Sequence, residues 1–239
     1  MVITGAGRGL GAALAIAAAD RGVVPILLGR SPARLEEVAA AIEQRTGRRC
    51  DGIVCDLSDY ASIASAAGSV TSAHPDIDIL VNSGAQWTGG DFEAQSDEAI
   101  EAVVASGVTG TLALTRHLLP ALRARPFADI HTVVSMSGLQ YARKRGSSVA
   151  FRAAKSAQDG FVQALTEEMI GTGIRVTSTY PGHIEDTSPL EESWNAERGL
   201  DAALSDRQVV ESILFILDMP PGTTIRSLVI ERTRTEFLS

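Results

Sequence analysis

The chain has 239 residues, of which 45% are hydrophobic and 21% are charged, and its formal net charge at pH 7 is −8. This composition predicts one globular domain, residues 1–239, with a large buried core. The acidic balance argues against nucleic acid or an anionic membrane as the main partner, because both bind basic surfaces. We see no apolar leader and no run of 18 apolar residues, so we expect no membrane span and a cytoplasmic location.

Short apolar segments alternate with Ala-rich or amphipathic segments along the whole chain. We expect strands at 2–4, 23–28, 52–55, 77–81, 130–134, 174–179 and 227–230. Continuous Val, Ile and Leu in such strands are typical of parallel sheets that are covered by helices on both faces. The pattern predicts a Rossmann-type, doubly wound α/β fold with seven mainly parallel strands.

Capping residues mark the expected ends of the helices. Ser31 followed by Pro32 predicts a helix start, because serine caps the free N–H groups and proline suits the first turn. The other predicted N-caps are Ser58, Ser96 and Ser205, and the predicted helix stops are Gly22 and Gly47. The segment 183–204 is long, polar and acidic, with Trp194 in its middle, and we predict that it forms a mobile lid over a substrate.

A glycine-rich turn follows the first predicted strand, where residues 4–11 read Thr-Gly-Ala-Gly-Arg-Gly-Leu-Gly. Glycine has no Cβ, so this backbone can adopt positive φ and approach a pyrophosphate, while N–H groups at the following helix start attract the charge. We therefore predict a dinucleotide-binding loop that uses Gly5, Arg8, Gly9, Leu10 and Gly11. The alternative is a tight turn without a ligand, which the order of strand, turn and helix disfavours.

The end of the second predicted strand bears on the choice of dinucleotide. NAD enzymes usually place an acid there, which hydrogen-bonds the ribose 2′-hydroxyl, but this chain has Gly29 followed by Arg30. Arg8 could approach the same point, and two guanidinium groups suit a 2′-phosphate. The sequence therefore favours NADP(H). The alternative is that both arginines are ordinary solvated side chains.

The motif T-G-x-x-x-G-x-G resembles the fingerprint of the short-chain dehydrogenase/reductase family, and further segments along the chain are similar to the same family. The resemblance implies an NADP(H)-dependent oxidoreductase that acts on a small carbonyl or alcohol substrate. It also implies a homodimer or homotetramer, formed through the helices near 96–124 and 147–170. Further cofactor contacts implied by the resemblance are Asp56 and Leu57 near the adenine, Asn82 after the fourth strand, and Pro181, Gly182 and Ile184 near the nicotinamide.

The implied catalytic positions contain two departures from the family. Ser135 resembles the serine that hydrogen-bonds the substrate carbonyl, with Ser137 as the alternative, and Lys155 resembles the lysine that holds the ribose. Phe151 occupies the position of the tyrosine that protonates the carbonyl oxygen. Gly107 occupies the position of an asparagine that kinks its helix and holds a relay water. Because phenylalanine has no hydroxyl, the resemblance implies weak or absent carbonyl reduction.

These departures leave several functions open: a weakened oxidoreductase, a non-catalytic NADP(H)-binding sensor or partner subunit, and an enzyme disabled by substitution at position 151. Another group could supply the proton. Tyr141 is the first candidate, followed by His183 and Tyr180, although each also fits an ordinary structural role. The four histidines show no metal-ligand spacing, so we expect no metal.

Overall fold

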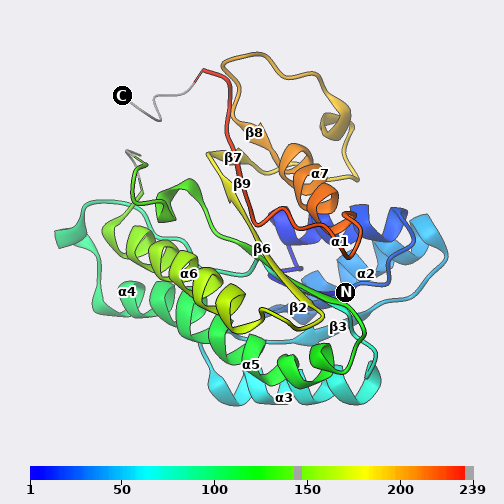
Figure 1. Ribbon diagram of the computed structural model, residues 1–239. Coiled ribbons are helices and arrows are strands. Elements are labelled where there is room, and N and C mark those ends of the chain that lie inside the picture. Colours follow the sequence, from blue (N-terminus) through cyan, green and yellow to red (C-terminus); the bar gives the residue numbers. More distant parts are fainter. Residues whose placement is uncertain (143–146, 235–239) are drawn as a thin grey trace.

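A seven-stranded sheet forms the centre of the molecule in the computed structural model, which describes residues 1–142 and 147–234 (Figure 1). Its order is β3-β2-β1-β4-β5-β6-β9, and every neighbouring pair is parallel. The strands are β1 (Val2–Thr4), β2 (Ile26–Gly29), β3 (Asp51–Val54), β4 (Ile79–Asn82), β5 (Ala128–Val133), β6 (Ile174–Pro181) and β9 (Ser227–Ile230). The predicted doubly wound fold is therefore confirmed. Each expected strand is present, with the bounds of β1 and β9 as predicted and the ends of the other five shifted by one to a few residues.

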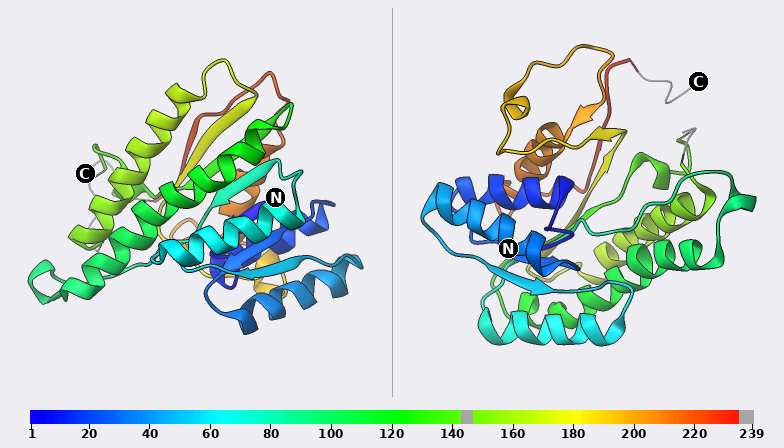
Figure 2. Two further views of the ribbon diagram at one scale, coloured as in Figure 1. Left: turned by 90° about the horizontal axis from the view of Figure 1, so that it is seen from below. Right: turned by 180° about the vertical axis from the view of Figure 1, so that it is seen from behind.

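Helices cover both faces of this sheet. They are α1 (Gly9–Asp20), α2 (Pro32–Thr46), α3 (Tyr60–Ala73), α4 (Asp97–Val104), α5 (Gly110–Arg123), α6 (Val149–Glu168) and α7 (Asp206–Leu217). A π-helical turn, η2 (Ala105–Thr109), joins α4 to α5, and short helices lie at η1 (Phe92–Ala94), η3 (Met136–Gly138) and η4 (Glu192–Asn195). Figure 2 shows the blue α1 and α2 and the orange α7 on one side of the sheet, and the cyan and green helices on the other.

Each face of the sheet has its own apolar core. On one face Leu114, Leu118 and Leu122 of α5 are fully buried against Ile63 and Val70 of α3 and the strands. Their spacing of four residues places them on one side of the helix. Burial of each leucine contributes about 1.5–3 kcal/mol relative to an exposed position. The second core lies under α1, α2 and α7.

The helical segment Asp97–Arg123 is long and apolar enough to cross a membrane by length and composition alone. Core helices of globular domains can have the same length and composition. In this segment the leucines of α5 are buried in the core described above.

The predicted helix ends are largely confirmed. Ser31, Ser96 and Ser205 each accept a hydrogen bond from the backbone N–H three residues later, and α2 ends at Gly47 with φ 70°. The prediction for Ser58 is wrong. The N-cap of α3 is Asp59, which accepts the N–H of Ala61 at 2.8 Å, because Ser58 instead donates its hydroxyl to Asp56.

The predicted lid segment lies beyond the carboxyl ends of the strands (Figure 1). Within it, β7 (Ile184–Glu185) pairs with β8 (Leu204–Ser205). Trp194 packs against the second core, and Arg198 bonds both Glu185 and the carbonyl of Ala203. These contacts hold the two ends of the segment together. That the segment moves as a lid over a substrate stays a prediction.

Candidate active site

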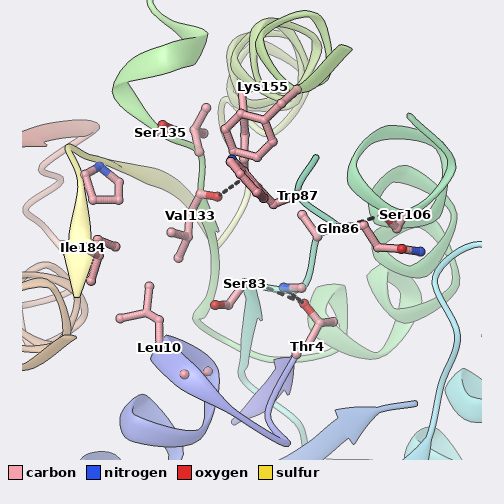
Figure 3. A pocket seen from close by; sticks show the side chains of 18 of the residues that line it. Thr4, Leu10, Ser83, Gln86, Trp87, Ser106, Val133, Ser135, Lys155 and Ile184 are labelled. Atoms are coloured by element: carbon pink, nitrogen blue, oxygen red, sulfur yellow. Dashed lines mark hydrogen bonds between the residues drawn. The ribbon is translucent and has the colours of Figure 1, made fainter. Parts of the chain in front are cut away.

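An open cleft of about 2200 Å³ lies at the carboxyl ends of the strands, where the strand order reverses between β1 and β4. Ligands of doubly wound sheets bind at this reversal. The cleft brings together most of the sequence-predicted site residues, namely Gly5, Arg8, Gly9, Leu10, Gly11, Arg30, Asp56, Leu57, Ser135, Phe151, Lys155, Pro181, Gly182 and Ile184. Figure 3 shows part of this lining. Asn82 and Gly107 lie behind the wall of the cleft.

The glycine loop has the shape that an anion-binding turn requires. Gly5 and Gly9 have φ of 69° and 53°, in the region that favours glycine. A Cβ on Gly11 would lie 2.5 Å from the carbonyl oxygen of Gly5, so the tight packing of strand against helix excludes a side chain. Arg8 caps α1 without a side-chain hydrogen bond, which leaves N–H groups at the helix start for a phosphate.

Thr4 connects the glycine loop to the next strand of the cleft. Its hydroxyl accepts the backbone N–H groups of Ser83 and Gly84 at 2.9 and 2.8 Å (Figure 3). The sequence motif contains Thr4 but assigns it no role. The sequence feature that could have indicated this role is the position of Thr4 directly before the glycines, at the end of a buried strand.

Asn82 supports this wall from behind. It is buried, and its amide donates to the hydroxyl of Thr115 at 3.2 Å, so the side chain points away from the cleft. Ser106 has a related role, because its hydroxyl accepts the N–H of Gln86 at 3.0 Å and donates to the carbonyl of Ala102 (Figure 3).

Three arginines gather at the end of the cleft beside β2. Arg8 and Arg30 are joined there by Arg34, from the first turn of α2, which the sequence reasoning missed. Within the described parts of the chain, none of the three forms an ion pair with a carboxylate. Asp56 also lines this end. Hydrogen bonds from Ser58, with a smaller contribution from the charge of Arg30, lower the pKa of its carboxyl, although burial opposes this.

Ser135 follows β5 and lines the opposite end of the cleft. Its hydroxyl accepts the N–H of Ser137 at 3.1 Å. The hydroxyl of Ser137 lies 2.9 Å from that of Ser147, so the alternative serine is already engaged by a neighbour. Ser135 Oγ donates to no acceptor in the described part of the chain, so its hydrogen is available for a ligand.

Lys155 is buried beside Phe151, one turn earlier on α6. Its Nζ donates to the carbonyl of Val133 at 3.0 Å (Figure 3) and to Oε1 of Gln158 at 2.8 Å. The loss of hydration lowers the pKa of Lys155 to about 7. Gln158 belongs to no motif that the sequence analysis used, and a buried glutamine gives little signal in a sequence.

Gly107 lies in the π-helical turn η2, so the helix is irregular at this position. The turn is buried at Gly107, whose carbonyl accepts Nε2 of Gln158 at 2.6 Å. A Cβ at Gly107 would make ordinary contacts with Ala154 and Ala85 at 3.7 and 3.9 Å. Glycine is therefore not required there for space.

The three candidate proton donors lie in different surroundings. The side chain of Tyr141 is 62% exposed, while its neighbours Gln140 and Ala142 line the cleft. Tyr180 is buried in the core, where its hydroxyl donates to Asp159 at 2.6 Å, and burial raises its pKa to about 12. His183 lines the cleft.

Two acidic residues near the lid segment were also missed. Asp186 lines the cleft and lies against Gly9, 3.4 Å from the place that a Cβ would take. Asp206 is fully buried and accepts the N–H of Thr187 at 2.9 Å. Burial raises the pKa of Asp206 to about 6, although the hydrogen bond from Thr187 opposes this.

Comparison with known sequences gives matches along most of the chain. The family model for short chain dehydrogenases matches residues 1–199. An uncharacterized oxidoreductase of Staphylococcus saprophyticus is 28% identical over 229 residues, which cover 96% of this chain and 95% of that protein. A 3-dehydrosphinganine reductase of Arabidopsis thaliana is 32% identical over 182 residues, which cover 75% of this chain and 53% of that protein.

Solved structures share the fold at lower identity. An alcohol dehydrogenase from the archaeon Thermococcus sibiricus, complexed with 5-hydroxy-NADP, has a TM-score of 0.84 at 22% identity and covers 99% of this chain and 98% of its own. L-sorbose reductase from Gluconobacter frateurii, complexed with NADPH and L-sorbose, has the same TM-score at 22% identity and covers 97% and 94%. With the glycine loop, the cleft and the family match in agreement, this chain belongs to the short-chain dehydrogenase family.

Proposed function

We propose that the protein is an NADP(H)-dependent oxidoreductase for a small carbonyl or alcohol substrate, with a proton-transfer step weakened by Phe151. The observation that carries the proposal is the composition of the two ends of one cleft. Arginines that form no ion pair with any described residue lie at one end, and Ser135 and Lys155 lie at the other. We expect a cytoplasmic location. We also expect a homodimer or homotetramer, and size-exclusion chromatography with light scattering would test this oligomeric state.

The arginine end supports NADP(H) rather than NAD(H). The end of the cleft beside β2 carries the positive charges of Arg8, Arg30 and Arg34, in a protein whose net charge is −8. Guanidinium groups make charge-assisted, often bidentate hydrogen bonds with phosphate. The glycine loop fits the rest of the dinucleotide, since Gly11 leaves no room for a Cβ and the Arg8 side chain does not cap the N–H groups at the start of α1.

The residues at the other end of the cleft support carbonyl reduction, except that Phe151 stands where a proton donor is needed. When bound, NADPH would supply a hydride to the substrate carbon. The Ser135 hydroxyl can donate to a carbonyl oxygen, and Lys155 has an N–H available for a ribose hydroxyl. Phe151 cannot donate a proton, and loss of a positioned general acid costs about 10²–10⁴-fold in rate.

A second candidate function is a non-catalytic NADP(H)-binding sensor or partner subunit. Phe151 favours it, because its ring lies beside the Lys155 ammonium, 5.6 Å away, and has no hydroxyl to donate a proton. The engagement of Lys155 by Gln158 favours it as well.

A pair of assays separates the two functions. NADPH binding is measured by fluorescence titration, and NADPH oxidation is then measured against a panel of ketones and aldehydes for the protein and for Phe151→Tyr. Slow oxidation by the unaltered protein that rises in Phe151→Tyr supports the oxidoreductase. Binding with no oxidation by the unaltered protein supports the sensor, and absence of NADPH binding contradicts both.

A further inference from the structure

Lys155 is one of only two lysines in the chain, the other being Lys144, and its side chain is 6% exposed. An ammonium group has three N–H donors and no acceptor. Two of the donors of Lys155 are used, by the carbonyl of Val133 and by Oε1 of Gln158. Among the residues that the structure describes, no third acceptor bonds Nζ, which leaves one donor for the cleft that Lys155 lines.

Gln158 is 1% exposed and bridges two groups of opposite character. Its Oε1 accepts from Lys155 at 2.8 Å, and its Nε2 donates to the carbonyl of Gly107 at 2.6 Å. An ammonium can only donate and a carbonyl can only accept, so these partners fix the orientation of the amide without ambiguity. Gln158 thus links α6 directly to the π-helical turn with its amide N–H and holds the lysine head group with its amide oxygen.

We infer that Gln158 is a positioning residue that holds the Lys155 ammonium against the Val133 carbonyl and aims its one remaining N–H at the cofactor ribose. The same amide separates Lys155 from the Gly107 carbonyl. A neutral amide does not take up or release protons near neutral pH, so no proton passes from Lys155 toward the π-helical turn by this route. The clamp formed by Val133, Lys155, Gln158 and Gly107 therefore favours binding over proton transfer.

The inference rests on the proposed function in one respect, which is that Lys155 contacts the cofactor. The clamp itself is a property of the protein without ligand. Replacement of Gln158 by an apolar residue would leave the carbonyl of Gly107 without this donor and the ammonium without this acceptor, and buried groups left in that way are costly. A near-isosteric change is therefore needed beside the apolar one.

The test follows the Lys155 side chain directly. With ¹³C-labelled lysine, the chain gives two ε-carbon signals, and Lys144→Arg assigns them. Both signals are titrated with pH in the unaltered protein, in Gln158→Glu and in Gln158→Leu. Gln163→Leu is the matched control, because Gln163 lies on the exposed side of the same helix and bonds Asp159 rather than Lys155 or the π-helical turn.

In Gln158→Glu a carboxylate beside the ammonium should raise the pKa of Lys155 by about 1 to 3. In Gln158→Leu the pKa should fall, because the charged form loses an acceptor, and NADPH affinity should fall about tenfold, as expected for one charge-assisted hydrogen bond. Gln163→Leu should change neither. If the pKa of Lys155 is the same in Gln158→Glu as in the unaltered protein, the clamp is wrong, regardless of the NADPH affinity.

The two proposals fail in different ways. If the unaltered protein binds no NADPH, the proposed function is wrong, and the lysine titration still decides on the clamp. If NADPH binds equally well to the unaltered protein and to a folded Gln158→Leu, Gln158 does not position Lys155 for the cofactor, although the chain keeps its proposed function.

Discussion

The ammonium nitrogen of Lys155 lies 5.6 Å from the centre of the Phe151 ring. At this distance the ring face attracts the cation, by about 0.5–2 kcal/mol depending on hydration. Phe151 therefore covers the lysine with an apolar surface and brings no proton to the cleft. A tyrosine in the same place would keep the contact and add a hydroxyl.

Phe151→Tyr should increase NADPH-dependent carbonyl reduction by about 10²-fold or more, because it adds a general acid beside Ser135 and Lys155. The rate is measured as NADPH oxidation against the carbonyl panel. Phe161→Tyr is the control, since it makes the same chemical change on the core side of α6. Equal rates in the unaltered protein and Phe151→Tyr would show that position 151 does not limit turnover.

Arg34→Ala and Arg30→Ala should each weaken NADPH binding by about 10- to 100-fold, the effect of losing a hydrogen bond to a charged phosphate. NADH lacks the 2′-phosphate, so its affinity should stay the same. Arg21→Ala is the control, because Arg21 pairs with Asp218 and does not line the cleft. Equal losses for NADPH and NADH would place these arginines at another part of the ligand.

Gly107→Ala and Gly110→Ala should have opposite effects on stability. Alanine at 107 finds room and lowers the backbone entropy of the unfolded chain, so the free energy of unfolding should rise by about 0.5–1 kcal/mol. A Cβ at Gly110 would lie 1.9 Å from the carbonyl oxygen of Leu57, so that variant should lose about 2 kcal/mol or more. Urea unfolding measures both, and a destabilised Gly107→Ala would mean that the π-helical turn requires glycine.

Asp206→Asn should stabilise the protein at pH 8 and have little effect at pH 4. The pKa of Asp206 is about 6 in the folded protein and near 3.9 when unfolded, so its stability penalty grows as pH rises from about 4 to 6. Above pH 6 the penalty is about 2–3 kcal/mol. Asp97→Asn is the control, because Asp97 also follows a serine N-cap but is exposed. An equal effect of Asp206→Asn at both pH values would contradict the shifted pKa.

Local sequence was sufficient to predict the parts of the site that depend on one segment. The glycine loop, Arg30 and Phe151 each follow from residues close together in the chain, and all three line the cleft. The start of α3 shows the limit of such reasoning. Ser58 and Asp59 can both cap a helix, and only the folded chain shows that Ser58 is held by Asp56.

Contacts between segments that are distant in the chain could not be predicted from the sequence. Gln158 meets Gly107, 51 positions away, and no motif connects them. The resemblance to the family implied that Asn82 contacts the cofactor. Its amide instead bonds Thr115, while the next residue, Ser83, lines the cleft, as expected when successive residues point to opposite sides.

The most direct test of the account is a fluorescence titration of the unaltered protein with NADPH and, in parallel, with NADH. The three arginines that line the cleft predict that NADPH binds at least about tenfold more tightly, since each charge-assisted hydrogen bond contributes about 1.5–3 kcal/mol. Tighter binding of NADH, or binding of neither dinucleotide, would contradict the central claim that this cleft holds NADP(H).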